Sequence, residues 1–170
     1  PVDYTPGAYR NATREGFRID YRNPMSQGTR AHQVAAYVVF DAPLVMLCDS
    51  PTRYMADEAC TRFIASLPVV FDTTRVLAGE IGEYIVTARK RQDCWYLGGL
   101  TGWTPRTLDV DLSLLDPGRE YTATLLADDG RSAAEPARYV LSTQRVTSAT
   151  RLQIPVAPGG GFALKIEPAD

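Results

Sequence analysis

The pattern of hydrophobic and polar positions divides the chain near residue 68 into two parts with different periods. Before this point, an unbroken apolar run over 44–48 ends at Asp49. A run of this length without polar alternation predicts a strand that is buried on both faces, as in a parallel sheet. Apolar residues over 30–40 are spaced as in a largely buried helix, and Thr29 stands at the position of its N-cap.

The elements around this helix and strand repeat the same order. Residues 2–4 read as a strand end, and the polar stretch over 8–28 predicts a long loop. A loop at 49–55 and a short helix over 57–67 follow the apolar strand, and Pro68 ends that helix. This order of strand end, loop, helix, strand, loop and helix is typical of the end of a TIM barrel or of a doubly wound sheet.

From residue 69 onward, apolar and polar residues alternate with a period of two. The clearest alternating runs are 84–89, 95–97, 107–114, 121–126, 139–143, 152–156 and 162–166, with Gly, Pro and Asp turns between them. About eight short strands at near-regular spacing predict an antiparallel sandwich with one core. The expected fold is therefore an α/β segment at 1–67, followed by an all-β antiparallel sandwich at 68–170.

Composition and charge exclude some partners. The chain has 170 residues, 22% of them charged, and a formal net charge of -2. Without a basic field we expect no nucleic acid partner, and without a window of about 18 apolar residues we expect no membrane span. The opening PVDYTPG has no Met and no signal-like region, so we expect a piece of a longer protein.

Acidic and aromatic residues near the predicted strand ends are the candidate site residues. Asp3 and Asp49 each stand at the carboxyl end of a predicted strand, where they either face a site or cap the following loop. Two carboxylates are suited to acid–base chemistry. Tyr4 and other tyrosines in the same loops suit stacking on sugar rings or anchoring of the loops.

The sulfur and imidazole groups give weaker indications. Cys48, Cys60 and Cys94 fit no metal motif, so we expect free thiols, with a Cys48–Cys60 disulfide as the alternative in an exported protein. His32 lies on the predicted helix and is interpreted as structural, with a contact to substrate as the alternative.

Three features of the second segment have competing interpretations. Trp95 is expected in the core, whereas Trp103, in a Gly-Trp-Thr-Pro turn, is expected to be exposed or at an interface with the preceding segment or with a second subunit. Asp109 and Asp111 alternate with apolar residues and indicate the solvated face of a strand, with a calcium site as the alternative. The glycine run at 158–161 lacks a following Lys and predicts a turn.

The chain resembles the C-terminal end of glycoside hydrolase family 97, the α-glucosidase and α-galactosidase family. The resemblance covers nearly the whole chain in order. The stretches that carry it are PVDYTPGAYRNATREGF, PMSQGTRAHQVAAYVVFDAPLVMLCDSPTRY, VFDTTRVLAGEIGEYIVTARK, CWYLGGLTGWTPRTLDVDLSLLDPGREYTATLLADDG and VAPGGGFALKIEP.

The resemblance implies that residues 1–67 are the last strands and helices of a TIM barrel. Residues 68–170 are then a C-terminal sandwich that serves oligomerisation or is an accessory domain. It further implies an intact, periplasmic or secreted enzyme that hydrolyses the α-glycosidic bonds of an oligosaccharide with the help of calcium.

The family's catalytic residues and calcium ligands lie upstream of PVDYTPG, so we expect none in this chain and expect the fragment alone to be inactive. The stretches DYTPG and CDSP match the substrate-facing rim of the barrel. Asp3, Tyr4 and Asp49 are therefore the candidate substrate-binding residues.

A non-catalytic β-sandwich module, for oligomerisation or carbohydrate binding, is the alternative function. The apolar helix and strand over 30–48 count against it, because without a barrel they would expose a large hydrophobic surface. For the same reason we expect the isolated chain to aggregate or to be partly disordered before residue 68, while 68–170 folds alone.

Overall fold

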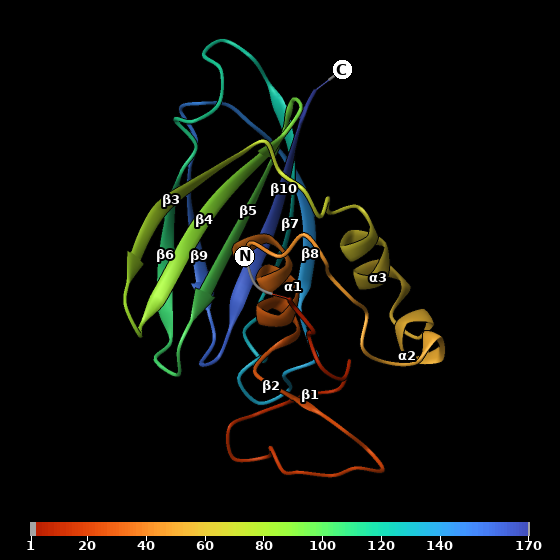
Figure 1. Cartoon of the computed structure of the whole chain (residues 1–170). Coiled ribbons are helices and arrows are strands. Elements are labelled where there is room, and N and C mark those ends of the chain that lie inside the picture. Colours follow the sequence, from red (N-terminus) through yellow and green to blue (C-terminus); the bar gives the residue numbers. More distant parts are fainter. Residues whose placement is uncertain (1–2, 170) are drawn as a thin grey trace.

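The computed structural model describes residues 3–169, and its centre is an antiparallel sandwich (Figure 1). The larger sheet has six strands in the order β3-β4-β5-β10-β7-β8, and a smaller sheet pairs β6 with β9. The strands are β3 (Thr73–Glu80), β4 (Tyr84–Arg91), β5 (Cys94–Thr101), β6 (Arg106–Asp111), β7 (Tyr121–Ala127), β8 (Val140–Val146), β9 (Arg151–Val156) and β10 (Gly161–Pro168). The predicted all-β antiparallel architecture of the second segment is confirmed.

One hydrophobic core fills the space between the two sheets. On β6, Leu108 and Val110 point into the core while Asp109 and Asp111 remain exposed, as the period of two requires. Trp95 is buried in the same core, as predicted. Gly99 leaves room for the ring of Phe162, since a Cβ at this position would lie 2.2 Å from its Cε1.

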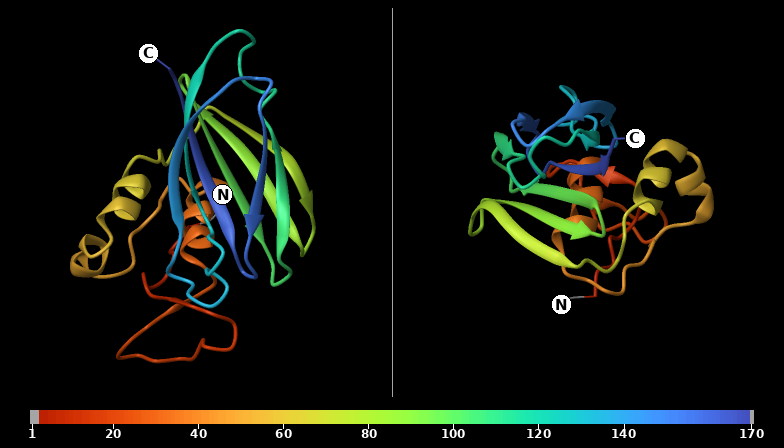
Figure 2. Two further views of the ribbon diagram at one scale, coloured as in Figure 1. Left: turned by 180° about the vertical axis from the view of Figure 1, so that it is seen from behind. Right: turned by 90° about the horizontal axis from the view of Figure 1, so that it is seen from above.

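Helix α1 (Arg30–Val39) covers the other face of the larger sheet, where it packs on β5 and β10 (Figures 1 and 2). The predicted N-cap is present, because the Thr29 side chain accepts a hydrogen bond from the backbone N–H of His32 at 3.1 Å. Gly98 allows the close approach, since a Cβ there would lie 2.9 Å from the carbonyl oxygen of Ala35. The centre of the sheet is thus buried on both faces.

Two short helices follow α1 beside the sheet, α2 (Pro51–Met55) and α3 (Glu58–Ala65) (Figure 1). The predicted helix over 57–67 is confirmed, with Asp57 as its N-cap. The loop prediction at 49–55 is wrong, because α2 begins at Pro51. Proline fits the first helical position, where its missing N–H would have no partner inside the helix.

The prediction of a buried strand over 44–48 is wrong in this structure. Val45 forms a single parallel bridge with Tyr4, and Leu44 and Leu47 are 57% and 54% exposed. A strand buried on both faces needs neighbours along its edges and layers on its faces, and the described residues supply only this bridge. The expected TIM-barrel fragment is therefore not evident as a sheet.

The polar stretch over 8–28 is a long loop, as predicted, closed near its base by two short strands. These are β1 (Asn11–Ala12) and β2 (Ser26–Gln27), which pair in parallel. The residues between them extend beyond the end of the sandwich (Figure 1). Of the predicted strand end at 2–4, Val2 lies outside the described residues.

Candidate functional site between the first segment and the sandwich

The three candidate substrate-binding residues lie in loops around the N-terminal part of the chain. Tyr4 is half-buried, with its ring edge-on to the rings of Tyr37 and Phe40 at centroid distances of 5.2 and 5.0 Å. Its hydroxyl donates to the carbonyl oxygen of Gln33 at 3.3 Å. Burial raises the pKa of Tyr4 above its ordinary value, so it acts here as a neutral anchor.

Asp49 holds two stretches of backbone together. Its Oδ2 accepts from the backbone N–H of Tyr9 at 2.7 Å, and its Oδ1 accepts from that of Ser50 at 2.7 Å. The structure therefore places Asp49 as a loop cap, whereas Asp3 is exposed.

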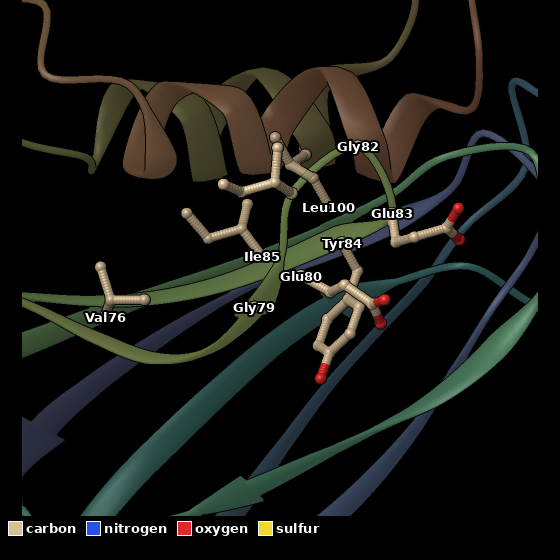
Figure 3. Close-up of a pocket in the computed structure, with 9 residues that line it drawn as sticks. Val76, Gly79, Glu80, Gly82, Glu83, Tyr84, Ile85 and Leu100 are labelled. Carbon is tan, nitrogen blue, oxygen red and sulfur yellow. The ribbon is translucent and has the colours of Figure 1, made fainter.

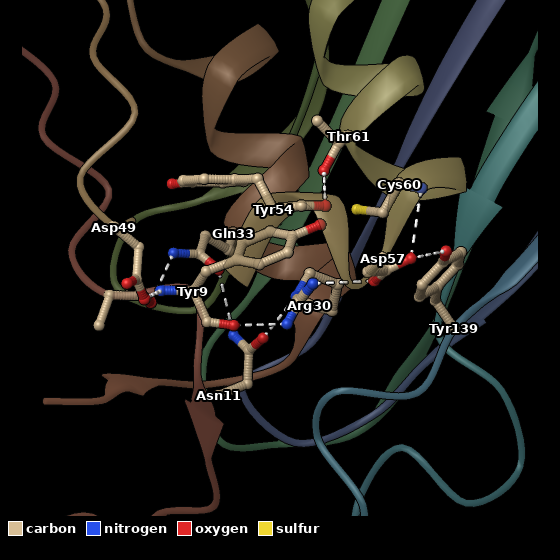
Figure 4. A network of polar contacts seen from close by, with 11 residues as sticks. Tyr9, Asn11, Arg30, Gln33, Asp49, Tyr54, Asp57, Cys60, Thr61 and Tyr139 are labelled. Carbon is tan, nitrogen blue, oxygen red and sulfur yellow. Dashed lines mark hydrogen bonds and ion pairs between the residues drawn. The ribbon is translucent and has the colours of Figure 1, made fainter. Parts of the chain in front are cut away.

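Arg30 is the centre of a buried polar network that the sequence analysis missed (Figure 4). Its Nε donates to Asn11 Oδ1 at 2.6 Å, its Nη2 donates to the carbonyl oxygen of Tyr9, and its Nη1 contacts Asp57 Oδ2 at 2.9 Å. The guanidinium also lies over the Tyr9 ring, 3.4 Å from the centroid.

A signal for this network is present in the sequence. Arg30 is the first residue of α1, where the helix dipole disfavours a cation. An arginine that is buried at this position needs an anion from elsewhere in the fold, and Asp57 supplies it.

Amide side chains hold the base of the loop against α1. Asn11 donates through its side chain to Gln33 Oε1 at 3.3 Å. Gln33 Nε2 in turn donates to the carbonyl oxygens of Pro6 and Ala8 at 3.0 and 3.1 Å. Because buried polar groups are costly without partners, these bonds fix the chain from Pro6 to Asn11 on the helix.

Asp57 links this network to the sandwich. Its Oδ1 accepts from the hydroxyl of Tyr139 at 2.6 Å and from the backbone N–H of Cys60 at 3.4 Å. Tyr139 immediately precedes β8, so this bond joins the N-terminus of α3 to the edge of the larger sheet (Figure 4).

A second junction forms where α1 meets the glycine run. The Nδ1 of His32 lies 3.0 Å from the carbonyl oxygen of Gly160, and burial lowers the pKa of His32. These contacts fit the structural interpretation of this histidine. Trp103 packs on Gly159, whose φ is +63°, and Arg14 of the long loop lies 5.6 Å from its ring centroid. Trp103 thus lies at an interface with the first segment, as expected.

An apolar hollow is lined by residues that belong to none of these networks (Figure 3). It measures about 510 Å³ and is formed around the turn between β3 and β4. Val76 and Ile85 line it, Ile81 at the turn is fully exposed, and the carboxylates of Glu80 and Glu83 flank it. Its lining offers few polar groups, so we interpret it as a contact surface.

The structure also shows the state of the three cysteines and the partners of the acidic residues on β6. All three cysteines are free thiols, so the alternative Cys48–Cys60 disulfide is not formed in this structure. Asp109 accepts a hydrogen bond from Gln153, and Asp111 pairs with Arg151. Within residues 3–169, no three His, Cys, Asp or Glu side chains gather as metal ligands do. No helix in this range has the length and apolar character to cross a bilayer.

Comparisons with known proteins agree with the resemblance seen in the sequence. The chain is 47% identical over 167 residues to a retaining alpha-galactosidase of Bacteroides thetaiotaomicron, a match that covers 98% of this chain and 25% of that protein. It is 30% identical over 165 residues to a probable retaining alpha-galactosidase of Streptomyces bingchenggensis, covering 95% of this chain and 23% of that protein.

A solved structure of a Glycoside Hydrolase Family 97 enzyme from Pseudoalteromonas sp. strain K8, in complex with panose, superposes with a TM-score of 0.81. The identity is 30%, and the match covers 84% of this chain and 23% of that one. The chain thus spans about a quarter of the length of these relatives. The family described as "Glycosyl-hydrolase 97 C-terminal, oligomerisation" matches residues 70–167, so the chain belongs to glycoside hydrolase family 97 through its C-terminal domain.

Proposed function

We propose that this chain is the C-terminal part of a glycoside hydrolase that cleaves α-glycosidic bonds of an oligosaccharide, with α-galactosides as the favoured substrates and α-glucosides as the alternative. The observation that carries the proposal is the 47% identity to the Bacteroides alpha-galactosidase over 98% of this chain. Because that match spans both segments in one relative, residues 1–67 belong with the sandwich and not to an unrelated arm.

Residues 1–67 are, in this proposal, the end of the catalytic barrel. Tyr4 and Val45 form a parallel bridge, and α1 lies between them in sequence. Two parallel segments joined by a helix are the repeating unit of such a barrel. The exposed Leu44 and Leu47 fit a strand whose neighbours come from the rest of the barrel.

Asp3, Tyr4 and Asp49 then belong to the substrate-facing rim, at the carboxyl ends of these two segments. Asp3 is free to face the sugar, whereas Tyr4 and Asp49 shape the rim through the anchoring bonds described above. The catalytic acids and the calcium ligands are assigned to the part of the enzyme outside this chain. Periplasmic or secreted location is part of the same proposal.

The test is a comparison of two proteins on p-nitrophenyl α-galactoside and p-nitrophenyl α-glucoside. We expect the full-length protein that contains this chain to cleave the galactoside, and the 170-residue chain to cleave neither. Calcium removal with a chelator should lower the activity of the full-length protein, and added calcium should restore it. Cleavage by the 170-residue chain alone would show that the catalytic groups lie within this chain, against the proposal.

A second role, self-association through the sandwich, is favoured by one specific feature. The fully exposed Ile81 and the exposed Val76 surround the apolar hollow at the turn between β3 and β4. Monomeric surfaces seldom leave such a patch uncovered. The description of the matched family as an oligomerisation domain supports a second copy as the partner.

A further inference from the structure

We propose that Tyr139 and Asp57 are positioning residues, through which the sandwich sets the place of the rim that carries Asp49. The proposal rests on the proposed function only in taking Asp49 as part of the substrate-facing rim. The contacts run from Tyr139 to Asp57, then to Arg30, to Tyr9 and to Asp49 (Figure 4).

The first step of this relay is the anchoring of Asp57 by the sandwich. The Tyr139 hydroxyl donates to Asp57 Oδ1 at 2.6 Å, a short bond to a charged acceptor. Burial raises the pKa of Tyr139, so the hydroxyl remains a donor. Without it, Oδ1 would keep only the 3.4 Å bond from the N–H of Cys60, and the carboxylate would be held less firmly against Arg30.

The second step is the dependence of Arg30 on Asp57. The side chain of Arg30 is 6% exposed, and Asp57 is the carboxylate that pairs with it. A buried guanidinium without its anion is strongly unfavourable. The position of Asp57 therefore helps to set where the Arg30 guanidinium lies, together with the bonds from Arg30 to Asn11 and Tyr9.

The third step is the link from Arg30 to Asp49 at the rim, which Tyr9 provides. The carbonyl oxygen of Tyr9 accepts from Arg30, its ring stacks against the guanidinium, and its N–H donates to Asp49 at 2.7 Å. The Tyr9 ring also contacts the ring of Tyr54, with the two centroids 4.3 Å apart. A shift of Arg30 thus moves the residue that holds the Asp49 carboxylate.

The experiment compares Tyr139→Phe with Tyr121→Phe in the full-length protein. Both changes remove one hydroxyl that donates to an aspartate, but Tyr121 donates to Asp116 at 3.1 Å within the sandwich. Two readouts are taken: the hydrogen exchange of the Tyr9 amide by mass spectrometry or NMR, and the kcat and KM for the α-galactoside.

We expect Tyr139→Phe to speed exchange of the Tyr9 amide about tenfold and to raise KM several-fold with kcat little changed, since a bond to a charged group is lost. Tyr121→Phe should change neither. Asp57→Asn, which keeps the helix cap but not the charge, should act in the same direction as Tyr139→Phe. A merely structural role would lower the melting temperature and the active fraction, and hence kcat, while leaving KM unchanged.

Equal exchange rates of the Tyr9 amide in Tyr139→Phe and in the wild type would show that Tyr139 does not position Tyr9, and would overturn the proposal. Faster exchange of the Tyr9 amide with an unchanged KM would overturn the proposed effect of Tyr139 on substrate binding at the rim. Should the full-length wild type cleave no glycoside, the proposed function fails, but the exchange experiment still decides whether the sandwich positions Tyr9.

Discussion

At the scale of single residues, Asp128 is a buried carboxylate whose two oxygens have different surroundings. Its Oδ2 accepts from the backbone N–H groups of Ala157 and Gly161, each at 2.9 Å. Its Oδ1 has no hydrogen-bond partner within residues 3–169. Burial raises the pKa of this carboxyl, and the side chain of Thr29 and the two backbone bonds oppose the rise only in part.

We expect Asp128→Asn to become more stable, relative to the wild type, as pH rises. A raised folded-state pKa means that the folded wild type holds this proton more tightly than the unfolded chain. Its contribution to stability is therefore present below the ordinary carboxyl pKa and is lost as pH rises through the raised value. Asparagine stays neutral and keeps an oxygen for both N–H groups. Free energies of unfolding from urea titrations between about pH 4 and about pH 8 measure the effect.

Asp111→Asn is the matched control, with a pKa shift of the opposite sign. The backbone N–H of Ser113 lowers the pKa of the exposed Asp111. That contribution is fully present above the ordinary carboxyl pKa and is lost as pH falls through the lowered value. Between about pH 4 and about pH 8 the stability difference between this variant and the wild type should therefore stay nearly constant, and only below about pH 4 should the difference shrink. A pH-independent difference for Asp128→Asn would contradict the prediction.

The role of a single residue could be predicted from the sequence only where its partners lie a few positions away along the chain. Thr29 caps the helix that follows it, and the cap was predictable from its neighbours. Arg30 meets Asp57 and Tyr9 from other elements, and no local pattern states which acid approaches it. The roles of Asp3, Tyr4 and Asp49 in substrate binding remain predictions.

At the scale of elements, the packing of α1 on the larger sheet depends on glycine. A Cβ at Gly98 would lie 2.9 Å from both the Ala35 carbonyl oxygen and the Val39 Cγ2. These neighbours belong to a helix that is itself held at its end, where the buried Arg89 of β4 donates to the carbonyl oxygen of Phe40 at 2.8 Å. The helix therefore has little freedom to retreat from a larger side chain.

We expect Gly98→Ala to lower the free energy of unfolding by about 1–3 kcal/mol, the usual cost of overpacking a core. Gly130→Ala is the control, because a Cβ at Gly130 meets nothing within 4 Å. Urea denaturation of the full-length protein, followed by tryptophan fluorescence, measures both. An unchanged midpoint for Gly98→Ala would mean that α1 does not hold its close approach in solution.

Helices and strands could be predicted where their apolar faces are covered by other elements of the described chain. The strands of the sandwich and α1 meet this condition, because their apolar faces are covered by one another. The run over 44–48 has the pattern of a buried strand but meets only Tyr4. Helix α2 was missed since Pro51 can mark either the start of a helix or a break. The Ser50 side chain, which accepts a cap bond from the backbone N–H of Arg53, decides for the helix.

At the scale of the whole molecule, the two segments share a core across the boundary near residue 68. Val34 of α1, Phe63 of α3, and Leu126 and Ala163 of the sheet form one buried cluster. The expectation that 68–170 folds alone remains a prediction. Removing 1–67 would uncover the face of β5 and β10 that α1 now covers.

The exposed apolar surface around Ile81, at the turn between β3 and β4, is the basis of the last prediction. We expect Ile81→Lys to weaken self-association of the full-length protein at least tenfold. Burial of one isoleucine contributes about 1.5–3 kcal/mol, and a lysine there adds a desolvation cost. Val140→Lys, at the opposite edge of the sheet on β8, is the control and should leave association unchanged. Size-exclusion chromatography with light scattering over a range of concentrations measures both.

The outcomes of this comparison separate three arrangements. Loss of association in Ile81→Lys alone assigns the contact to the turn between β3 and β4. Loss in Val140→Lys alone moves it to β8, and the apolar hollow would then need another occupant, for which the upstream barrel is the natural candidate. A wild-type protein that stays monomeric at every concentration would reject self-association, and the exposed Ile81 would have to be explained within a single copy.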